Sequence, residues 1–462
     1  MPLRYQPTSE SLEQHLVPDW FHDAKLGIFI HWGLYSVPAW APRSETFVDL
    51  VPKRGYEYHF KHNSYAEWYW NTISIEGSPS HQHHLKAYGE GFSYHDFIPL
   101  FREATQGWAP EIWASLFEFA GARYVVLTTK HHDGFLLWPS EHPNPFKDGY
   151  QSERDLAGEL TDAVRAHGMR MGLYYSGGLD WTFQGLGISN LNEFIQAVPR
   201  SEEYARYADT HWRELIERYE PSILWNDIGY PAAANAPQLF ADFYNRVPDG
   251  VINDRFQIVP GRRGPRAVHF DFRTPEYKVL DSIEERKWES TRGMGNSFGF
   301  NRNETDEDLI STEALVHMLV DVVSKNGNLL LNVGPTADGT IPWSQAERLL
   351  GLGWWLRTNG DAIYGTRPWQ AATGETADGI EVRFTQKGDA VYAVLLGMPE
   401  DGPVVIRGIE LHPGSGVELL GFRSPLSWEQ RSEGVAITLR GPATGAPAYG
   451  FRISPAPRLS TP

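Results

Sequence analysis

The sequence predicts an α/β barrel followed by a smaller antiparallel β-sandwich. Up to about residue 366, short apolar runs typical of buried strands alternate with amphipathic helical segments, as in a parallel sheet covered by helices. From residue 367 onward, apolar and polar residues alternate in short runs separated by turns, which is typical of antiparallel strands with one buried face. A chain of 462 residues is too long for one core, so we expect two domains, 1–366 and 367–462.

The strands expected in the first domain are continuous apolar runs, as parallel strands buried on both faces should be. They are 28–30, 124–127, 171–173, 223–224, 251–254 and 328–333. The first four run into His, Tyr, Trp or Asp residues. Burial does not explain such endings, whereas a parallel barrel projects its catalytic side chains from the carboxyl ends of its strands. A pocket rich in histidine, carboxylate and aromatic side chains is suited to binding and cleaving a sugar.

Helical patterns separate these strands, at residues 110–120, 155–167, 201–219, 311–325 and 344–358. Gly121 can end the first, and Ser344 with Glu347 has the spacing of a capping box at the start of the last. The aromatic, histidine-rich stretch 40–100 is expected to be an insertion whose loops overhang the site. In the second domain, the runs 380–384, 391–394 and 435–439 alternate as sandwich strands should.

Composition excludes several classes of function. The net charge of −17 makes nucleic acid an improbable partner and favours a neutral substrate. The absence of cysteine rules out disulfides, a thiol nucleophile and Cys-ligated zinc. No apolar run approaches the roughly 18 residues of a membrane span, and the N-terminus lacks a signal-peptide core. We therefore expect no membrane association and a cytoplasmic location, unless a signal peptide has been removed.

Asp227 is the first candidate catalytic residue. It ends the run 222–227 and is followed by a glycine turn, so its carboxylate should point into the barrel mouth. In that position it could act as a glycosidase nucleophile, although an Asp there could equally cap the next helix.

Glycoside cleavage also needs a second carboxyl group to protonate the leaving oxygen. Glu276, Glu67 and Glu289 are the candidates, and the residues alone do not choose among them.

The sequence His131-His132-Asp133 suggests a metal site at first sight. Adjacent residues on a strand point to opposite faces, however, and a metal needs three or more converging ligands. We therefore expect no metal and no cofactor, and we interpret the histidines as partners for sugar hydroxyl groups. Other side chains at strand ends complete the candidate set, namely His31, Trp32, Tyr174, Trp225 and Arg255.

Several long motifs resemble the family 29 glycoside hydrolases, the retaining α-L-fucosidases. The matching stretches span most of the first domain, in order: 20–33, 129–135, 174–181, 224–227, 297–304 and 329–335. The resemblance implies a (β/α)8-like barrel with a C-terminal β-sandwich, and an exo-acting enzyme that releases terminal α-L-fucose from fucosylated glycans through a covalent fucosyl-enzyme intermediate.

The resemblance also implies residue roles. It makes Asp227 the nucleophile and Glu276 the leading acid/base, with Glu289 still open. The positions that match the fucose pocket are His31, Glu67, Trp68, His131, His132, Tyr174, Trp225, Arg255 and Phe300. A homo-oligomer is expected from the resemblance alone.

The sequence leaves two alternative functions. A lectin built on the same fold would bind fucosides and leave them intact. A metal-dependent hydrolase using His131, His132 and Asp133 would lose its activity in EDTA.

Overall fold

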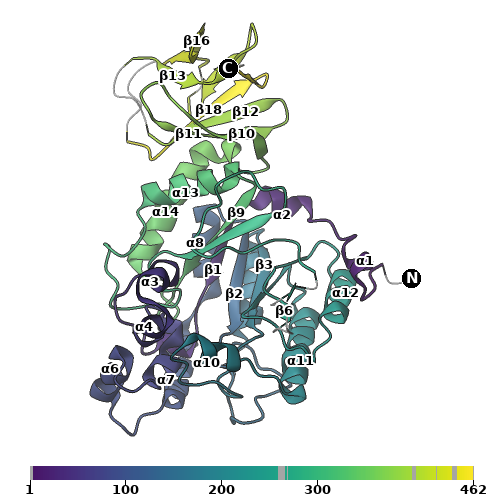
Figure 1. Ribbon diagram of the computed structural model, residues 1–462, viewed down its shortest axis with the longest axis vertical. Helices are drawn as coiled ribbons and strands as arrows, with labels where there is room; N and C mark the ends of the chain where they lie inside the picture. The colour runs from purple at the N-terminus through teal and green to yellow at the C-terminus, as the bar shows by residue number, and fades with distance from the viewer. Residues whose placement is uncertain are drawn as a thin grey trace.

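The computed structural model describes residues 4–258, 266–267, 269–397, 402–422, 424–439 and 445–460. Its first part is a curled parallel sheet surrounded by helices, and its second part is an antiparallel β-structure packed on one end (Figure 1). The expected fold class, an α/β barrel with a C-terminal β-sandwich, is confirmed, with a seven-stranded sheet in place of eight regular strands.

The parallel sheet has the strand order β5-β4-β3-β2-β1-β9-β8. Its strands are β1 (Leu26–Ile30), β2 (Tyr124–Lys130), β3 (Arg170–Ser176), β4 (Ile223–Asp227), β5 (Val251–Ile252), β8 (Trp288–Gly293) and β9 (Gly327–Val333). Neighbours pair in parallel, for example Gly27 with Tyr124, and nearly every residue of these strands is buried. Gly27 must lack a side chain because a Cβ there would lie 2.3 Å from the Tyr124 ring.

An irregular segment joins the two edge strands of this sheet. Asn253, just after β5, forms a parallel bridge with Phe272, and Arg273 and Glu276 bridge to Trp288 and Thr291 of β8. Backbone hydrogen bonds support the contacts, including one of 2.8 Å from the Asp271 N–H to the Ile252 carbonyl. Segment 271–276 thus occupies the place of the missing regular strand.

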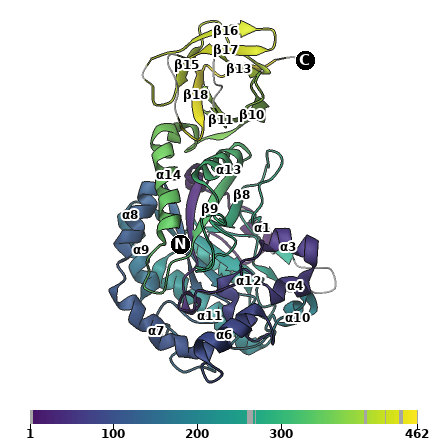
Figure 2. The ribbon, with the colours of Figure 1, turned by 90° about the vertical axis from the view of Figure 1, so that its left-hand side faces the viewer.

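Helices cover the outside of the sheet (Figure 2). They are α8 (Pro110–Ala120), α9 (Leu156–Ala166), α11 (Glu202–Tyr219), α12 (Ala236–Arg246), α13 (Thr312–Ser324) and α14 (Trp343–Asn359), while α1 (Ser9–Leu12) and α2 (Asp19–Ala24) precede β1. Gly121 ends α8 in the left-handed conformation, as predicted. The predicted capping box is wrong: α14 begins at Trp343, and its N-cap is Pro342, which has no side chain able to accept the hydrogen bond.

The insertion after β1 folds into short helices: α3 (Phe47–Arg54), α4 (Tyr56–Lys61), the 3-10 turn η2 (Ala66–Trp68), α5 (Tyr69–Ile73), α6 (Pro79–Tyr88) and α7 (Phe97–Ala104). A shorter excursion after β3 carries α10 (Leu191–Gln196). Helices α6 and α7 lie at the end of the molecule away from the C-terminal part (Figures 1 and 2). Among the described residues, no helix combines the length and apolar character needed to cross a membrane.

The C-terminal part contains two main antiparallel sheets. One has the order β10 (Arg367–Glu375), β11 (Glu381–Lys387), β12 (Ala390–Leu395), β18 (Tyr449–Ser454) and β15 (Gly416–Leu419). The other has the order β13 (Val404–Arg407), β17 (Gly434–Thr438) and β16 (Ser427–Arg431). A short pair in this part is formed by β14 (Ile409–Glu410) with β19 (Arg458–Leu459). Another short pair, β6 (Gln257–Ile258) with β7 (Arg266–Ala267), belongs to the first part of the molecule.

The two parts meet through α13 and α14. The Trp355 indole donates a 2.8 Å hydrogen bond to the Ala448 carbonyl, and Arg383 of β11 pairs with Asp321 of α13. The first strand of the C-terminal part, β10, begins at Arg367. The division into two domains at residues 366 and 367 remains a prediction, since contact across the boundary is extensive.

Candidate active site

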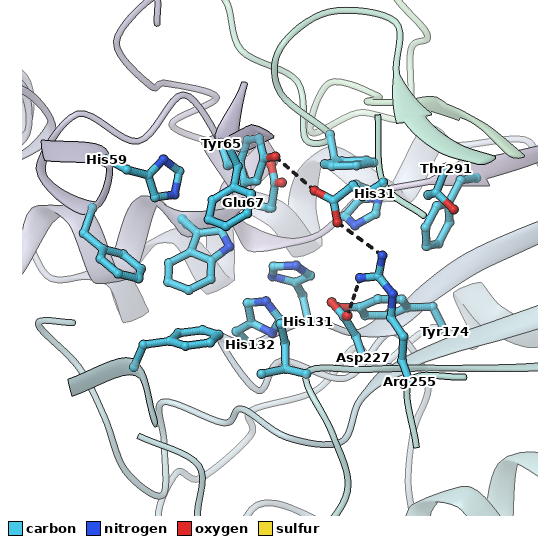
Figure 3. Close-up of a pocket in the computed structure, with 18 of the residues that line it drawn as sticks. His31, His59, Tyr65, Glu67, His131, His132, Tyr174, Asp227, Arg255 and Thr291 are labelled. Atoms are coloured by element: carbon cyan, nitrogen blue, oxygen red, sulfur yellow. Dashed lines mark hydrogen bonds and ion pairs between the residues drawn. The ribbon is translucent and has the colours of Figure 1, made fainter. Parts of the chain in front are cut away.

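A pocket of about 220 Å³ opens at the carboxyl ends of the parallel strands. Its inner part is lined by side chains that follow or end β1 to β5, joined by residues from the insertion and from segment 271–276 (Figure 3). The predicted residues that line it are His31, Glu67, Trp68, His131, His132, Tyr174, Trp225, Asp227, Arg255 and Glu276. The fold therefore brings together residues from positions 31 to 276 of the chain.

Asp227 is the last residue of β4, and its side chain is largely buried. One carboxylate oxygen accepts a 2.8 Å hydrogen bond from Arg255, and the other accepts a 2.9 Å hydrogen bond from the Tyr174 hydroxyl. Burial would by itself raise the pKa of Asp227, but the Arg255 guanidinium, which is both a nearby positive charge and a hydrogen-bond donor, outweighs it and holds this pKa below its usual range. The group is thus kept ionised.

The backbone turns sharply after Asp227. Ile228 has a φ of 60°, which is unusual for a β-branched residue, and Gly229 follows with a φ of 100°. The Ile228 carbonyl passes so close to Gly178 that a Cβ at that position would lie 2.1 Å from it. The glycine after β3 therefore permits the turn that places Asp227 at the pocket.

Glu276 lies on the segment that joins β5 to β8. Its carboxylate accepts a 3.0 Å hydrogen bond from the Tyr65 hydroxyl and contacts Arg255 at 3.3 Å. The same guanidinium therefore contacts both Asp227 and Glu276, through different nitrogens, and holds the two carboxyl groups near one cation.

Two histidines of the pocket, His31 and His132, are neutral and are oriented by fixed partners. Burial lowers the pKa of His31 to about 4 and that of His132 to about 3. Asn332 donates to the Phe298 carbonyl, so its oxygen accepts from His31 Nδ1 at 2.6 Å. Ser176 donates to the Leu179 carbonyl, so its oxygen accepts from His132 Nδ1 at 2.7 Å. Each Nε2 is then left as a hydrogen-bond acceptor.

Glu67 lies on η2 and is almost fully buried. It accepts hydrogen bonds from the Gly299 N–H at 2.8 Å and from the Ser297 hydroxyl at 3.3 Å. Burial raises the pKa of Glu67 to about 7 despite these donors. Near neutral pH this carboxyl group can therefore exist in protonated and ionised forms.

Aromatic rings form the floor of the inner pocket. Tyr174 stacks on Trp225 with the ring centroids 5.5 Å apart, and the Arg255 guanidinium lies 4.8 Å above the Trp225 ring. Phe29 and Phe298 complete the floor and were missed from the sequence. Phe29 could have been found, because it lies two residues before His31 on one strand and so shares its face.

Phe300 is a correction to the predicted set. The pocket is lined by Phe298, and Phe300 is not among its lining residues. The backbone around Gly299 passes Glu67 and Gly334, and this turn directs position 298 inward.

Glu289 is also absent from the pocket. It lies near the start of β8, fully buried, and pairs with Asn328 at the start of β9. The Tyr124 hydroxyl donates to it at 2.5 Å, and the Trp225 indole donates at 3.0 Å. Of the three candidate acids, only Glu67 and Glu276 line the pocket, and Glu289 lies beneath its aromatic floor.

His131 and His132 line the pocket, but Asp133 points elsewhere and accepts a 2.8 Å hydrogen bond from Tyr94. Across the described ranges, the group whose donor atoms converge as metal ligands is His15, His269 and Asp271. These side chains already bond to one another and to Tyr244: His15 Nδ1 lies 2.9 Å from Asp271, and the Tyr244 hydroxyl donates to Asp271 at 2.7 Å.

Comparison with known proteins explains this arrangement. The family model described as alpha-L-fucosidase matches residues 2–361, and the model of the alpha-L-fucosidase C-terminal domain matches residues 377–453. The chain belongs to the α-L-fucosidase family. It is thus a glycoside hydrolase, and the resemblance drawn from the motifs is confirmed.

The relatives of this chain are similar to it in sequence over nearly its whole length. The tissue alpha-L-fucosidase of Homo sapiens is 34% identical over 97% of this chain and 90% of its own. Crystal structures of Thermotoga maritima alpha-fucosidase are 44% identical, one in complex with fucose (TM-score 0.86, covering 97% of this chain and 100% of that one) and one with a mechanism-based inhibitor (TM-score 0.87, covering 98% and 100%). The agreement in fold thus includes both the barrel and the C-terminal sheets.

Proposed function

We propose that this α-L-fucosidase is a retaining, exo-acting enzyme that hydrolyses terminal α-L-fucose from fucosylated glycans through a covalent fucosyl-enzyme intermediate. One observation carries the proposal: an ionised aspartate and a second carboxylate flank a single arginine in a small pocket at the strand ends. Retaining glycosidases use two carboxyl groups that lie about 5–5.5 Å apart, one as nucleophile and one as acid/base.

Asp227 is the nucleophile in this mechanism. Arg255 and Tyr174 keep its carboxylate ionised and oriented, so that it can attack the anomeric carbon. Glu276 protonates the departing oxygen and then takes a proton from the water that releases the intermediate. Its contact with Arg255 keeps it beside Asp227, and the hydrogen bond from Tyr65 fixes its orientation.

The other lining residues suit a 6-deoxy sugar. The neutral His31 and His132 present Nε2 acceptors, and Glu67 and His131 add polar contacts for the remaining hydroxyl groups. The aromatic floor of Phe29, Trp225 and Phe298 offers an apolar surface for the methyl group. The cavity of about 220 Å³ lies below the roughly 300–1,000 Å³ of pockets that enclose drug-sized ligands, which favours capture of one terminal sugar.

The test is release of nitrophenol from 4-nitrophenyl α-L-fucoside by wild type, Asp227→Gly and Glu276→Ala, with and without azide. We expect Asp227→Gly to lose at least about 10⁴-fold in kcat and azide to restore turnover with formation of the β-fucosyl azide. Azide should rescue Glu276→Ala with retained configuration. Glu289→Gln serves as the control, because that carboxyl group lies outside the pocket.

Other outcomes point elsewhere. If Asp227→Gly yields no inverted azide, the covalent intermediate on Asp227 is excluded. If Glu276→Ala behaves like wild type, another residue is the acid, and Glu67 is then the remaining candidate in the pocket. A wild-type protein that binds fucosides without turnover would support a lectin.

A further inference from the structure

We propose that the outer part of the pocket is a leaving-group subsite that binds a flat apolar aglycone, such as an aryl group, by stacking rather than by hydrogen bonds. This inference rests on the proposed function, because it requires a fucosyl unit in the inner pocket. It adds a preferred class of substrate, namely fucosides whose leaving group presents an apolar face.

The pocket changes character from its inner to its outer part. The charged lining residues belong to the inner part, where Glu67, Asp227, Arg255 and Glu276 lie. The outer lining is a set of residues that we call the aromatic wall: Phe47, Tyr56, His59, Phe60, Leu191 and Phe194. Because the wall holds no charged side chain and little hydrogen-bonding capacity, a hydroxyl-rich chain would find few partners on it.

The aromatic wall is continuous with the catalytic centre. Trp68 makes an edge contact with His132 at 5.3 Å between ring centroids. Phe60 lies 5.9 Å from Trp68 and also 5.9 Å from Phe194, and it stacks with Tyr56 at 6.5 Å. An aromatic leaving group attached to a fucosyl unit in the inner pocket would therefore lie next to aromatic side chains of the wall.

The proposed acid marks this side of the pocket as the leaving-group side. Tyr65, whose hydroxyl donates to Glu276, lies edge-on to His59 of the wall at 6.2 Å between ring centroids. His59 and Tyr65 lie on the same side of the pocket in Figure 3, away from Asp227. The acid must contact the glycosidic oxygen, so the aglycone attached to that oxygen extends toward the wall.

Two features show that the wall is suited to an apolar ligand. Its rim exposes large apolar surfaces, since Tyr56 is 36% and Leu191 40% exposed. His59, its one imidazole, is buried. Burial lowers the pKa of His59 to about 4, so the ring carries no charge at neutral pH.

The wall is held in place by a contact between two loops. The side chain of Asn71, on α5, donates to the Ile188 carbonyl at 3.1 Å and accepts from the Ile188 N–H at 2.8 Å. Ile188 lies three residues before Leu191 and the start of α10. The face that α10 contributes is therefore fixed relative to the face that the insertion contributes, which lowers the entropic cost of binding.

The experiment compares benzyl α-L-fucoside with 2-methoxyethyl α-L-fucoside, whose leaving groups are both primary alcohols of similar acidity. We expect wild type to have the higher kcat/KM for the benzyl fucoside. Phe194→Ala should lower kcat/KM for the benzyl fucoside about 3- to 10-fold, which corresponds to the usual stabilisation by one aromatic pair. It should leave kcat/KM for the methoxyethyl fucoside nearly unchanged. Inhibition by free fucose should not change, because fucose occupies only the inner pocket.

Ile195→Ala is the matched control, since this residue is on the same helix, is 45% exposed and does not line the pocket. Phe47→Ala provides a second variant on the opposite side of the wall. An equal kcat/KM for both fucosides in wild type, or a ratio unaltered by Phe194→Ala and Phe47→Ala, would overturn the inference and leave the proposed function intact. Failure of wild type to hydrolyse either fucoside would overturn both.

Discussion

At the scale of single residues, Arg255 sets the charge balance of the pocket. Its guanidinium contacts Asp227 and Glu276 and covers the face of Trp225. It therefore links the two proposed catalytic carboxylates to the aromatic floor. No pattern in the sequence reveals this arrangement, because the three partners of Arg255 come from β4 and from an irregular segment about 50 residues further along the chain.

Replacing Arg255 by Met should shift the pH dependence of activity. Without the guanidinium, the pKa of Asp227 rises, so the carboxylate becomes protonated, and inactive, at a higher pH than in wild type. We expect the acidic limb of the kcat/KM profile to move to higher pH, with a smaller shift in Arg255→Lys. An unmoved acidic limb in Arg255→Met would show that Asp227 does not control it.

Glu289 allows a test of stability. Burial raises its pKa to about 7, so between the ordinary value of 4.5 and pH 7 the folded chain holds a proton that the unfolded chain releases. The free energy of unfolding therefore falls as pH rises through this range, by about 3 kcal/mol at most for this group. Glu289→Gln should remove this contribution to the decrease in the free energy of unfolding.

The measurement is urea unfolding of wild type and Glu289→Gln at pH 5 and pH 8. Loss of one accepted hydrogen bond should cost about 1 kcal/mol at both pH values, so the informative quantity is the change between them. Glu313→Gln, at an exposed site on α13, is the control. Equal pH dependence in wild type and Glu289→Gln would contradict a raised pKa at Glu289.

At the scale of elements, the strands with continuous apolar runs were predictable and the polar one was not. The predicted run 223–224 lies within β4, and the predicted helix 201–219 corresponds to α11 (Glu202–Tyr219). Strand β8 has the sequence Trp-Glu-Ser-Thr-Arg-Gly, which carries no apolar pattern, yet all but one of its residues are buried. Its buried Glu289 is tolerated because Tyr124 of β2 and Trp225 of β4 donate hydrogen bonds to the carboxyl group.

Substitution of Asn71 by Ala should loosen α10. The loss of two buried hydrogen bonds to Ile188 removes about 2 kcal/mol of local stability, and the segment around residues 186–197 should open more often. Faster hydrogen exchange of that segment would show it, with exchange of the sheet unchanged. Gln196→Ala, on the exposed side of α10, is the control. Equal hydrogen exchange in wild type and Asn71→Ala would show that the hydrogen bonds between Asn71 and Ile188 do not hold α10 in place.

At the scale of the whole molecule, the C-terminal sheets are part of the barrel's packing. Tyr392 and Ala448 of the C-terminal part belong to the same buried cluster as Leu352 and Trp355 of α14. Figure 1 shows α13 and α14 directly beneath these sheets. The two parts should therefore unfold together.

Trp355→Ala tests this coupling. The side chain is buried and donates to Ala448, so its removal should cost about 3–5 kcal/mol and lower the melting temperature of the whole chain in one transition. The neighbouring Trp354 is 65% exposed, and Trp354→Ala should cost less than about 1 kcal/mol. Two separate calorimetric transitions in the Trp355→Ala protein would show that the parts unfold independently.

The sequence alone determined the fold class, the family and most of the residues that line the pocket, because buried parallel strands and their endings leave a local pattern. The tertiary structure decided which glutamate lies beside Asp227. Glu276 is on the irregular segment between β5 and β8, and Glu289 is on the polar strand β8, and only the fold determines which of the two faces the pocket. It also placed Phe298 at the pocket instead of Phe300, and built the aromatic wall from two distant loops. These outcomes depend on contacts between residues far apart in the chain, and such contacts have no signature in local composition or periodicity.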